Sequence, residues 1–233
     1  MGINYSPKIV TNGLVLCLDA ANSLSYPGSG TVWTDLSGNG NNGTLTNGPT
    51  YSSANRGSIV FDGTNDNIDL PSLGSFTVSS TLSIEAWVYP TIDPTTNKEI
   101  VSQYSTGSLF NCGLSSNNSK YLFAYVSRLN LGADITYDTT PYSLNNWYCL
   151  TGLYDGSFVW LYVNGIFKSK AAYSNALTAT SNNSVWYIGK LRQLSTDYYY
   201  WNGRIPNVKI YNRVLTASEV LQNYNATKGR FNL

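Results

Sequence analysis

Short runs rich in β-branched and aromatic residues recur along the whole chain of 233 residues, and turn residues separate them. Asn-Gly pairs such as Asn164-Gly165 and Asp-Gly pairs such as Asp155-Gly156 tolerate the positive φ that tight turns require. No helical pattern alternates with these runs, so a parallel α/β fold is not expected. The pattern predicts about ten strands, over Leu14–Leu18, Ser58–Phe61, Leu82–Tyr89, Glu99–Tyr104, Leu109–Leu114, Tyr121–Ser127, Trp147–Tyr154, Phe158–Val163, Val185–Gly189 and Arg204–Tyr211.

One helix is predicted, near the end of the chain. Thr216 and Glu219 have the spacing of a capping box, in which each side chain accepts a hydrogen bond from a free backbone N–H group. Apolar residues follow at helical spacing, so we expect a short helix over about residues 217–226. No linker divides the chain. The sequence therefore predicts a single domain over residues 11–233, preceded by an N-terminal arm over residues 1–10.

The composition shows that most polar residues of the chain are uncharged. Charged residues make up 12% of the chain and aromatic residues 14%, including 19 Tyr. The charged fraction is about half of the usual ~25%. Interfaces between proteins favour Tyr and Trp and are depleted in Lys, Glu and Asp. We therefore expect a homo-oligomer or a subunit bound in an assembly, with residues 1–10 or Tyr198–Trp201 at the contact.

Missing residue types exclude several kinds of site. The chain has no His, which excludes His-based triads, His metal sites and His pH switches. Cys17, Cys112 and Cys149 have no C-x-x-C spacing, so a zinc site is not expected. Their odd number indicates free thiols in a reducing compartment, although one disulfide with one free thiol stays open. We expect no nucleic-acid binding, no membrane span and no signal peptide, because basic runs and long apolar stretches are lacking.

Charge is unevenly distributed along the chain. Residues 1–167 carry a net charge of −6 and residues 168–233 carry +7, which gives the formal net charge of +1. Two interpretations stay open. The C-terminal strands return beside N-terminal ones, so that opposite charges interleave in space, or the C-terminal part forms a separate basic docking face.

Seven segments, taken in chain order, carry a further signal: Gly13–Asp19, Asp35–Thr44 after Trp33, Ser58–Gly63, Leu82–Val88, Gly152–Gly156, Leu161–Gly165 and Gly203–Arg213. Together they span nearly the whole chain and resemble the laminin-G-like, concanavalin A-like jelly-roll family. The resemblance implies two antiparallel sheets packed face to face, with Ile84, Ala86 and Val88 on the core side and Trp87 and Tyr89 on the other side, covered by loops.

The resemblance also implies a rim site for Ca²⁺, because members of the family often hold this ion in neighbouring loops. Ca²⁺ takes six to eight oxygen ligands, several from carboxylates. The matching positions are Asp19 and Asp35, with Asn39 and Asn41 as carbonyl donors. A second acidic group is Asp62, Asp66 and Asp69. The pair of Asp that many members carry near the end is replaced by Pro206-Asn207, and structural turns without a metal remain the alternative.

Carbohydrate binding is the second candidate activity. Aromatic platforms with nearby amides and carboxylates suit the apolar faces and hydroxyls of sugars. The densest such cluster is Tyr198–Trp201 followed by Asn202, and we name Tyr198, Tyr200, Trp201 and Asn202 as candidate glycan-binding residues. Adjacent strand residues alternate faces, so two of the four aromatic residues would be core and two exposed. Trp33, Trp186 and Tyr142 are scattered companions, and a purely structural role for all these rings stays open.

Hydrolysis of a glycosidic bond is not expected. It requires two carboxylates about 5–10 Å apart, which neighbouring strand positions such as Glu-x-Asp supply. The chain has only three Glu, namely Glu85, Glu99 and Glu219, and none has an acidic residue two positions away. Asp66 and Asp69 are three positions apart and would lie on opposite faces of a strand.

The sequence thus predicts a non-enzymatic binding domain. Its closing segment, Leu221–Phe231, resembles the ends of such domains in bacteriophage and environmental virus structural proteins. We expect a virion surface protein, a capsid decoration or tail-fibre adhesin, that docks on capsid or tail proteins and binds host glycans. A free bacterial lectin module is the alternative, and a degenerate glucanase is a third.

Overall fold

The computed structural model describes residues 7–73, 81–105, 111–128, 132–172, 184–193 and 196–233. Within them the strands form two large antiparallel sheets and a small hairpin. The first sheet has the order β14-β13-β12-β7-β18-β5-β4, with β19 beside β7 and β1 beside β19. Its strands are β1 Leu14–Asp19, β4 Thr50–Ser52, β5 Ser58–Asp62, β7 Leu82–Pro90, β12 Tyr148–Tyr154, β13 Phe158–Val163, β14 Ile166–Ala172, β18 Asn202–Ile205 and β19 Asn207–Tyr211.

The second sheet has the order β11-β10-β9-β8-β15-β6-β3-β2. Its strands are β2 Val32–Trp33, β3 Gly43–Thr46, β6 Asn67–Leu70, β8 Lys98–Ser105, β9 Asn111–Ser116, β10 Leu122–Arg128, β11 Gly132–Tyr137 and β15 Ser184–Ile188. The hairpin pairs β16 Leu191–Gln193 with β17 Thr196–Tyr198, and the helices are α1 Ala217–Thr227 and the short 3₁₀ turns η1 Ala54–Arg56 and η2 Lys228–Arg230. The predicted all-β, two-sheet jelly-roll sandwich with one short C-terminal helix is confirmed.

The predicted strands agree with the structure where apolar residues dominate. Residues 204–211 form two strands, because Pro206 lacks the N–H group that a ladder needs. The expected strand over residues 109–114 begins at Asn111, and its first two residues lie outside the described part. Strands β3 and β14 were not predicted, because polar residues interrupt the apolar ones in both sequences. At the hairpin between β13 and β14, Asn164 and Gly165 both have positive φ, 53° and 74°.

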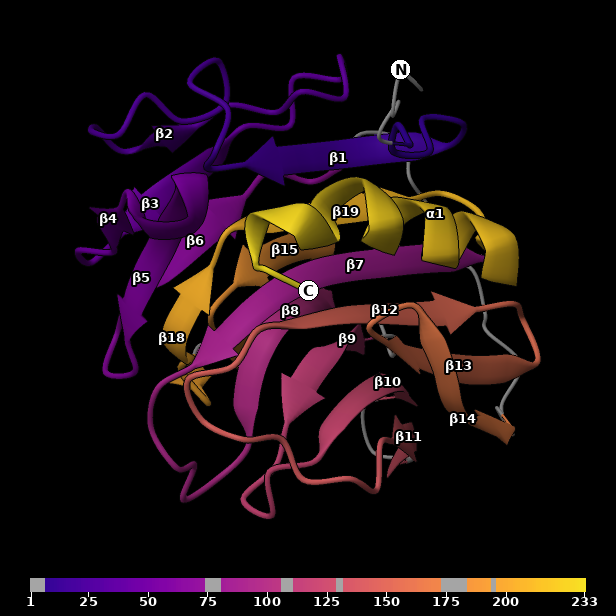
Figure 1. Cartoon of the computed structure of the whole chain (residues 1–233). Coiled ribbons are helices and arrows are strands. Elements are labelled where there is room, and N and C mark those ends of the chain that lie inside the picture. Colours follow the sequence, from indigo (N-terminus) through magenta and orange to yellow (C-terminus); the bar gives the residue numbers. More distant parts are fainter. Residues whose placement is uncertain (1–6, 74–80, 106–110, 129–131, 173–183, 194–195) are drawn as a thin grey trace.

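The core lies between the sheets. Ile84, Ala86 and Val88 of β7 point into it, as predicted. Trp87 lies on the opposite face, where it stacks on Tyr224 and Phe231 with ring centroids 5.7 and 4.2 Å away. The cover over this outer face is therefore α1 and the C-terminal tail rather than the expected loops. Figure 1 shows α1 lying across β7 and β19.

A buried ion pair lies beneath α1. The Lys209 ammonium donates to the Glu85 carboxylate at 2.6 Å, and the two side chains are 3% and 0% exposed. Burial alone would lower the pKa of Lys209, but the adjacent Glu85 carboxylate outweighs burial and raises it. The Asn223 amide of α1 donates to the other Glu85 oxygen at 3.0 Å and to the Tyr211 hydroxyl at 2.9 Å. The network thus attaches the helix to the sheet.

The same network reaches the N-terminal segment. The Val10 N–H donates to the Asn223 amide oxygen at 2.8 Å, and the Tyr211 hydroxyl donates to the Val10 carbonyl at 3.1 Å. The Gln222 amide donates to the Lys8 carbonyl at 2.7 Å. The C-terminal end of the expected arm, residues 8–10, is therefore bound to the domain, while residues 1–6 lie outside the described part.

The helix begins as predicted. The Thr216 hydroxyl accepts from the Glu219 N–H, and the Glu219 carboxylate accepts from the Thr216 N–H, so the capping box is confirmed. Glu219 also accepts from both terminal nitrogens of Arg213, at 2.9 and 2.6 Å. The hydrogen bond from Arg213 is the main cause that lowers the pKa of Glu219 to about 2.

Opposite charges from the two parts of the chain interleave, as the first interpretation of the charge pattern expected. Cations of residues 168–233 pair with carboxylates of residues 1–167 in four places: Lys168 with Asp138, Lys190 with Asp69, Lys209 with Glu85 and Arg230 with Asp19.

Cys17, Cys112 and Cys149 are all buried free thiols, as the odd count indicated. In the part of the chain that the structure describes, no helix is long and apolar enough to cross a membrane.

The buried pair generates a stability prediction. Lys209→Met leaves the Glu85 charge buried without its partner, and we expect the free energy of unfolding to fall by about 3–5 kcal/mol. Glu85→Gln combined with Lys209→Met removes both charges, so the double variant should lose much less than the sum of the single variants. Chemical denaturation of the wild type, the two single variants and the double variant measures this coupling. Additive losses would contradict the role given to the pair.

Candidate functional site

A cleft of about 230 Å³ opens at one end of the sandwich, where four chain segments meet. It combines carboxylates, an ammonium group, an amide and aromatic rings on one concave surface. Its lining residues are Asp62 and Gly63 of the turn after β5, Ile92, Asp93, Thr95 and Lys98 between β7 and β8, Tyr142, and Trp201 and Asn202 at the start of β18. Trp201, Asn202, Tyr142 and Asp62 were each singled out from the sequence, and the structure brings them together.

Asn202 is held in a fixed orientation. Its amide nitrogen donates to the Asp62 carbonyl at 2.6 Å, and its amide oxygen accepts from the Thr91 hydroxyl at 2.5 Å. Gly63 has φ of 78°, and a Cβ there would lie 2.8 Å from the Asn202 Cβ. Glycine is therefore needed both for the turn and for the close approach. Asn202 connects the turn to the loop after β7 and so shapes the cleft.

Charge in the cleft is only partly compensated. The Asp62 carboxylate accepts from the Thr64 N–H at 2.8 Å, and this bond is the main cause that lowers the Asp62 pKa. Asp93 pairs with Lys120 at 3.2 Å. Within the described residues, the half-buried Lys98 has no ion-pair partner. Lys98 is therefore a donor that a ligand can engage, beside carboxylates that can accept from hydroxyls.

The predicted aromatic platform is divided. Tyr198 and Tyr199 are 42% and 38% exposed and Tyr200 is half-buried, whereas Trp201 is 1% exposed and belongs to the core between the sheets. This corrects the expectation for Trp201, whose ring contributes only a buried wall of the cleft. The expected alternation of faces fails because Tyr199 has φ of 57°, which breaks the strand after β17. Trp33 and Trp186 are core residues.

The four proposed calcium ligands have other partners. Both Asp35 oxygens accept hydrogen bonds, from the N–H groups of Cys17 and Ser37 at 2.8 and 2.9 Å and from the Ser37 hydroxyl and the Asn41 N–H at 2.7 and 3.0 Å. A carboxylate with this many donors organises its loop without a cation. The amide nitrogens of Asn39 and Asn41 both donate to the Val15 carbonyl, at 3.2 and 2.9 Å.

The Asp19 carboxylate, which was expected to bind a metal, pairs with the Arg230 guanidinium. Its Oδ1 accepts from Arg230 Nη1 at 2.7 Å and from the Ala21 N–H at 3.0 Å. A positive group already neutralises this carboxylate, so the arrangement does not fit Ca²⁺ as it stands. In the described segments, no group of three or more Cys, Asp or Glu side chains could hold a metal. Calcium binding stays a prediction without support from this geometry.

The second acidic group also serves the local structure. Asp66 accepts from the Asp62 N–H at 3.0 Å. Asp69 accepts from the Thr46 hydroxyl at 2.7 Å and pairs with Lys190 at 3.3 Å. Only Asp62 of this group lines the cleft.

None of the three glutamates is placed for hydrolysis. Glu85 is sealed beneath α1 with Lys209, and Glu219 caps the same helix. Glu99 lies on the outer side of β8, where its carboxyl accepts from the Tyr125 hydroxyl at 3.2 Å and is 3% exposed. Burial raises the pKa of Glu99 to about 8, although the Tyr125 hydrogen bond opposes this. Each carboxyl group thus has a structural partner.

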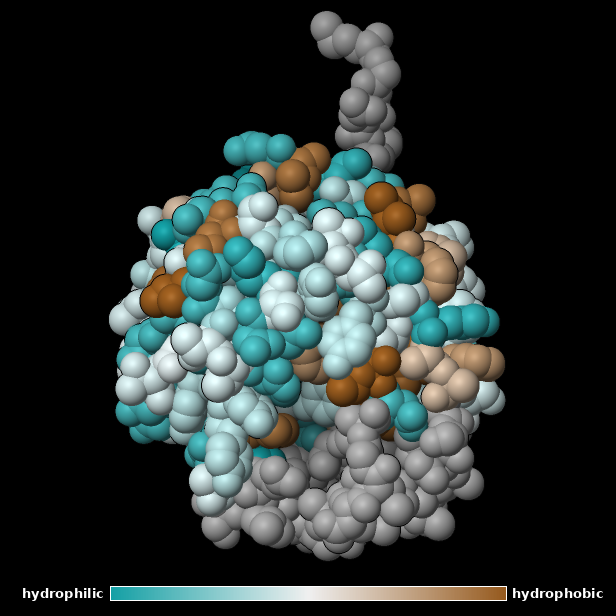
Figure 2. All heavy atoms as spheres, turned by 90° about the horizontal axis from the view of Figure 1, so that it is seen from below, coloured by the Kyte–Doolittle hydropathy of each residue, from teal (hydrophilic) through white to brown (hydrophobic). Residues whose placement is uncertain are grey.

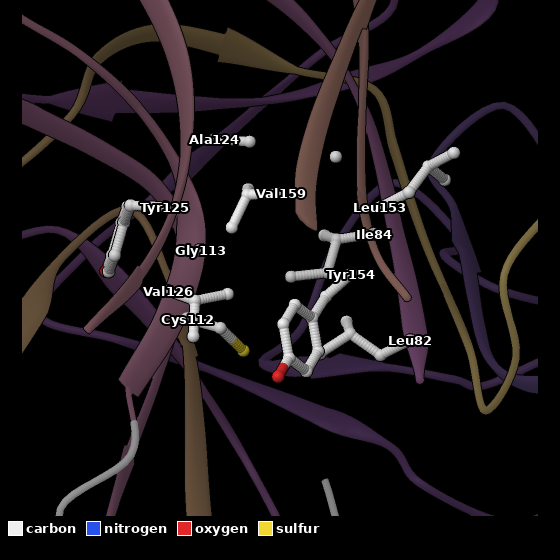
Figure 3. A pocket seen from close by; sticks show the side chains of 11 residues that line it. Leu82, Ile84, Cys112, Gly113, Ala124, Tyr125, Val126, Leu153, Tyr154 and Val159 are labelled. Carbon is white, nitrogen blue, oxygen red and sulfur yellow. The ribbon is translucent and has the colours of Figure 1, made fainter. Parts of the chain in front are cut away.

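The interior of the sandwich offers no room for a ligand in the region that Figure 3 shows. The cavity there measures about 10 Å³, which is about the space of one water molecule. Apolar side chains of both sheets surround it, and the Cys112 sulfur points toward Tyr154. Tyr125 projects away from the cavity, on the opposite side of its strand. This cavity therefore has no room for a ligand larger than a water molecule.

One aromatic feature was missed by the sequence reasoning. Phe158, Trp160 and Tyr162 alternate along β13 on its outer face, and Phe167 of β14 lies 5.8 and 5.6 Å from the rings of Trp160 and Tyr162. The Lys170 ammonium lies 4.5 Å above the Phe158 ring. The signal was available, since every residue of this strand is apolar or aromatic, which indicates that both faces are partly covered.

Comparison with known families and structures confirms the fold. The model of the Laminin_G_3 family, described as the concanavalin A-like lectin/glucanases superfamily, matches residues 62–221. No curated protein matches the sequence. Domain 4 of a GH43 extracellular arabinanase from Geobacillus stearothermophilus, solved in complex with arabinotriose, is similar with a TM-score of 0.67 and 20% identity, over 91% of this chain and 98% of that one.

Two other similar structures are parts of longer chains. A Trypanosoma rangeli sialidase mutant that displays trans-sialidase activity has a TM-score of 0.67 and 16% identity, over 95% of this chain and 34% of that one. The receptor-binding domain of botulinum neurotoxin C/D mosaic serotype has a TM-score of 0.70 and 14% identity, over 92% of this chain and 51% of that one. The chain thus spans about a third of the sialidase and about half of the toxin structure, and at these identities the likeness concerns the fold.

The buried Glu99 carboxyl generates a pH prediction. Its pKa of about 8 lies above the ordinary 4.5, so the folded protein holds a proton that the unfolded chain releases. The free energy of unfolding should therefore fall as pH rises from about 4.5 to about 8, by a few kcal/mol, and level off above. The chain has no His to titrate in this window. Denaturation of Glu99→Gln should show a nearly flat profile, and an unchanged slope would contradict the assignment.

Proposed function

Because the chain belongs to the concanavalin A-like lectin/glucanases superfamily, we propose that it binds carbohydrate in the rim cleft without cleaving it. The observation that carries this proposal is the convergence of Lys98, Asp62 and Asn202 with the Tyr142 wall in one cleft of about 230 Å³. Such a volume approaches the lower end of ordinary ligand pockets, ~300 Å³. It suits one or two sugar rings at the end of a glycan.

Each lining group has a role that matches a hydroxyl-rich ligand. The Asp62 carboxylate can accept from a pair of neighbouring hydroxyls, and the unpaired Lys98 ammonium can donate to ring or hydroxyl oxygens. Tyr142 is 4% exposed and gives the cleft a rigid aromatic wall. Asn202 is already bonded to Asp62 and Thr91, so it holds the cleft in shape.

The absence of cleavage is proposed from the positions of the carboxyl groups. The cleft holds Asp62 and Asp93. Asp62 is held ionised by backbone N–H groups, and Asp93 is exposed beside Lys120. The lowered pKa of Asp62 is the opposite of the raised pKa that a general acid requires. Glu99 has a raised pKa, but it is enclosed and does not line the cleft.

The cleft generates a binding prediction. A glycan array that includes neutral oligosaccharides such as arabinotriose should identify a ligand, whose affinity is then measured by calorimetry. Lys98→Met and Asp62→Asn should each weaken binding about tenfold, which is ~1.4 kcal/mol, with little change in melting temperature. Lys8→Met, at an exposed position that does not line the cleft, is the matched control. Turnover of the bound sugar, or equal affinity in the cleft variants and the control, would contradict the proposal.

We further propose that the domain works on a virion surface, as the resemblance of its closing segment implies. An exposed apolar patch supports docking on a larger assembly. Ile166, Phe167 and Leu221 are 63%, 46% and 45% exposed, and the Gly165 turn brings β14 close to Leu221. Figure 2 shows one face of the molecule, on which hydrophobic side chains form separate small patches among polar ones. The patch on β14 and α1 is therefore our candidate contact, in place of Tyr198–Trp201.

The assembly proposal predicts that the protein is a component of purified virus particles. Mass spectrometry of particles should find it, and light scattering should find an oligomer or a complex with capsid or tail proteins. Phe167→Lys should weaken that association without loss of the melting transition, whereas Leu24→Lys, at an exposed apolar residue outside the patch, should not weaken it. A protein that stays monomeric and never copurifies with particles would instead indicate a free lectin module.

A further inference from the structure

A second concave site lies at the C-terminal end of α1. It has a volume of about 330 Å³ and lies between η1 and the segment that follows the helix. Arg56 of η1 and Lys228 and Arg230 of η2 line it, together with the Asn225 amide. Among the described residues that line it, none has a carboxylate side chain, in contrast to the cleft with Asp62 and Asp93.

The two walls of this basic pocket are held together by specific bonds. The Asn55 amide donates to the Arg230 carbonyl at 3.2 Å, and Arg230 Nη2 donates to the Gly57 carbonyl at 3.1 Å. Gly57 has φ of 135°, and a Cβ there would lie 2.2 Å from the Ala20 carbonyl oxygen. Arg56 itself has φ of 70°, in the left-handed region. A pocket made from residues almost two hundred positions apart is therefore a fixed part of the fold.

Positive charge exceeds negative charge in the pocket. Arg230 is neutralised by Asp19 at 2.7 Å, and its side chain is 10% exposed. In the described part of the chain, Arg56 and Lys228 have no ion-pair partner; Lys228 lies 5.4 Å from the Tyr224 ring. The C-terminus of a helix carries about half a negative charge, and the main-chain carboxylate of Leu233, which also lines the pocket, carries one more. Together they offset most, but not all, of the charge of the two cations. The pocket therefore has a net positive potential that an anion would neutralise.

We propose that this pocket binds an acidic sugar, through a carboxylate or sulfate group that meets Arg56 and Lys228. A guanidinium binds such a group with two parallel hydrogen bonds, and a lysine adds a point charge. The Asn225 side chain supplies a donor and an acceptor for a neighbouring hydroxyl. This inference rests on the proposed carbohydrate-binding function and deepens it, since the cleft, with two carboxylates, suits neutral sugars and the basic pocket suits charged ones.

The test compares charged and uncharged probes. A uronic-acid oligosaccharide and a sulfated oligosaccharide are titrated by calorimetry beside their uncharged parent sugars. We expect the acidic probes to bind, and their affinity to fall as salt concentration rises. Arg56→Gln with Lys228→Gln should weaken that binding at least tenfold at low salt. Arg56→Lys keeps the positive charge but loses the two parallel hydrogen bonds of the guanidinium. Its affinity for the acidic probes should lie between that of the wild type and that of Arg56→Gln.

Two controls separate this pocket from the cleft. Lys8→Gln removes an exposed charge outside the pocket and should not change the binding of acidic probes. Lys98→Met alters the cleft and should weaken the binding of neutral probes more than that of acidic ones. Equal binding in the wild type and the double variant, or a loss confined to Lys98→Met, would overturn the inference. Binding of neutral sugars alone would overturn it and leave the proposed function intact. Binding of no sugar at all would overturn both.

Discussion

The buried ion pair between Glu85 and Lys209 constrains the whole first sheet. Two charges can stay in a protein interior only when they pair and find further hydrogen-bond partners. Asn223 supplies one such partner, and through Asn223 the pair holds α1 and Val10 against the sheet. The outer face of β7 and β19 is thereby closed. The carboxylate that from sequence alone could be mistaken for a catalytic group is instead a structural anchor.

The second sheet is closed at its centre by similar means. Tyr125 lies over Gly113 and bonds to Glu99, and the Glu99 N–H donates to the Tyr199 carbonyl at 2.8 Å. Lys190 is 4% exposed and bonds to Asp197 of the small hairpin at 3.2 Å. Near these residues the outer faces of both sheets are covered and the space between the sheets is filled. The accessible polar groups of the cleft and of the basic pocket lie at the rim of the sandwich. The cleft and the basic pocket are the two rim sites with the clearest mixed polar lining.

Much of the fold could be predicted from the sequence, because buried strands such as Leu82–Tyr89 carry a strong apolar pattern and the turns carry Asn-Gly or Asp-Gly pairs. Strand β14 could not, since the polar run Lys168–Lys170 interrupts its apolar residues and its pairing depends on β13. For the cleft, the sequence predicted some of the residues that line it but not that they meet in one place. Trp201 was named as an aromatic platform and Asn202 as its polar neighbour, but the partners that make a cleft, Lys98 above all, come from distant segments without a local signal.

The residues that line the basic pocket could not be predicted from the sequence, for a related reason. The C-terminal excess of positive charge is visible in the sequence, but four of those cations pair with distant carboxylates, and the sequence does not tell which ones do. Arg56 belongs to the acidic part of the chain, so its meeting with Lys228 depends on tertiary structure alone. Net charge along a sequence thus predicts pairing better than it predicts a binding surface.

The central claim is that sugar is bound at the rim and not on a sheet face. A crystal structure with the neutral oligosaccharide selected by a glycan array tests it most directly. The account predicts density for the sugar between Asp62, Lys98 and Tyr142, with its glycosidic bonds intact. Density on the outer face of β8 and β15, or a cleaved sugar beside Glu99, would contradict it.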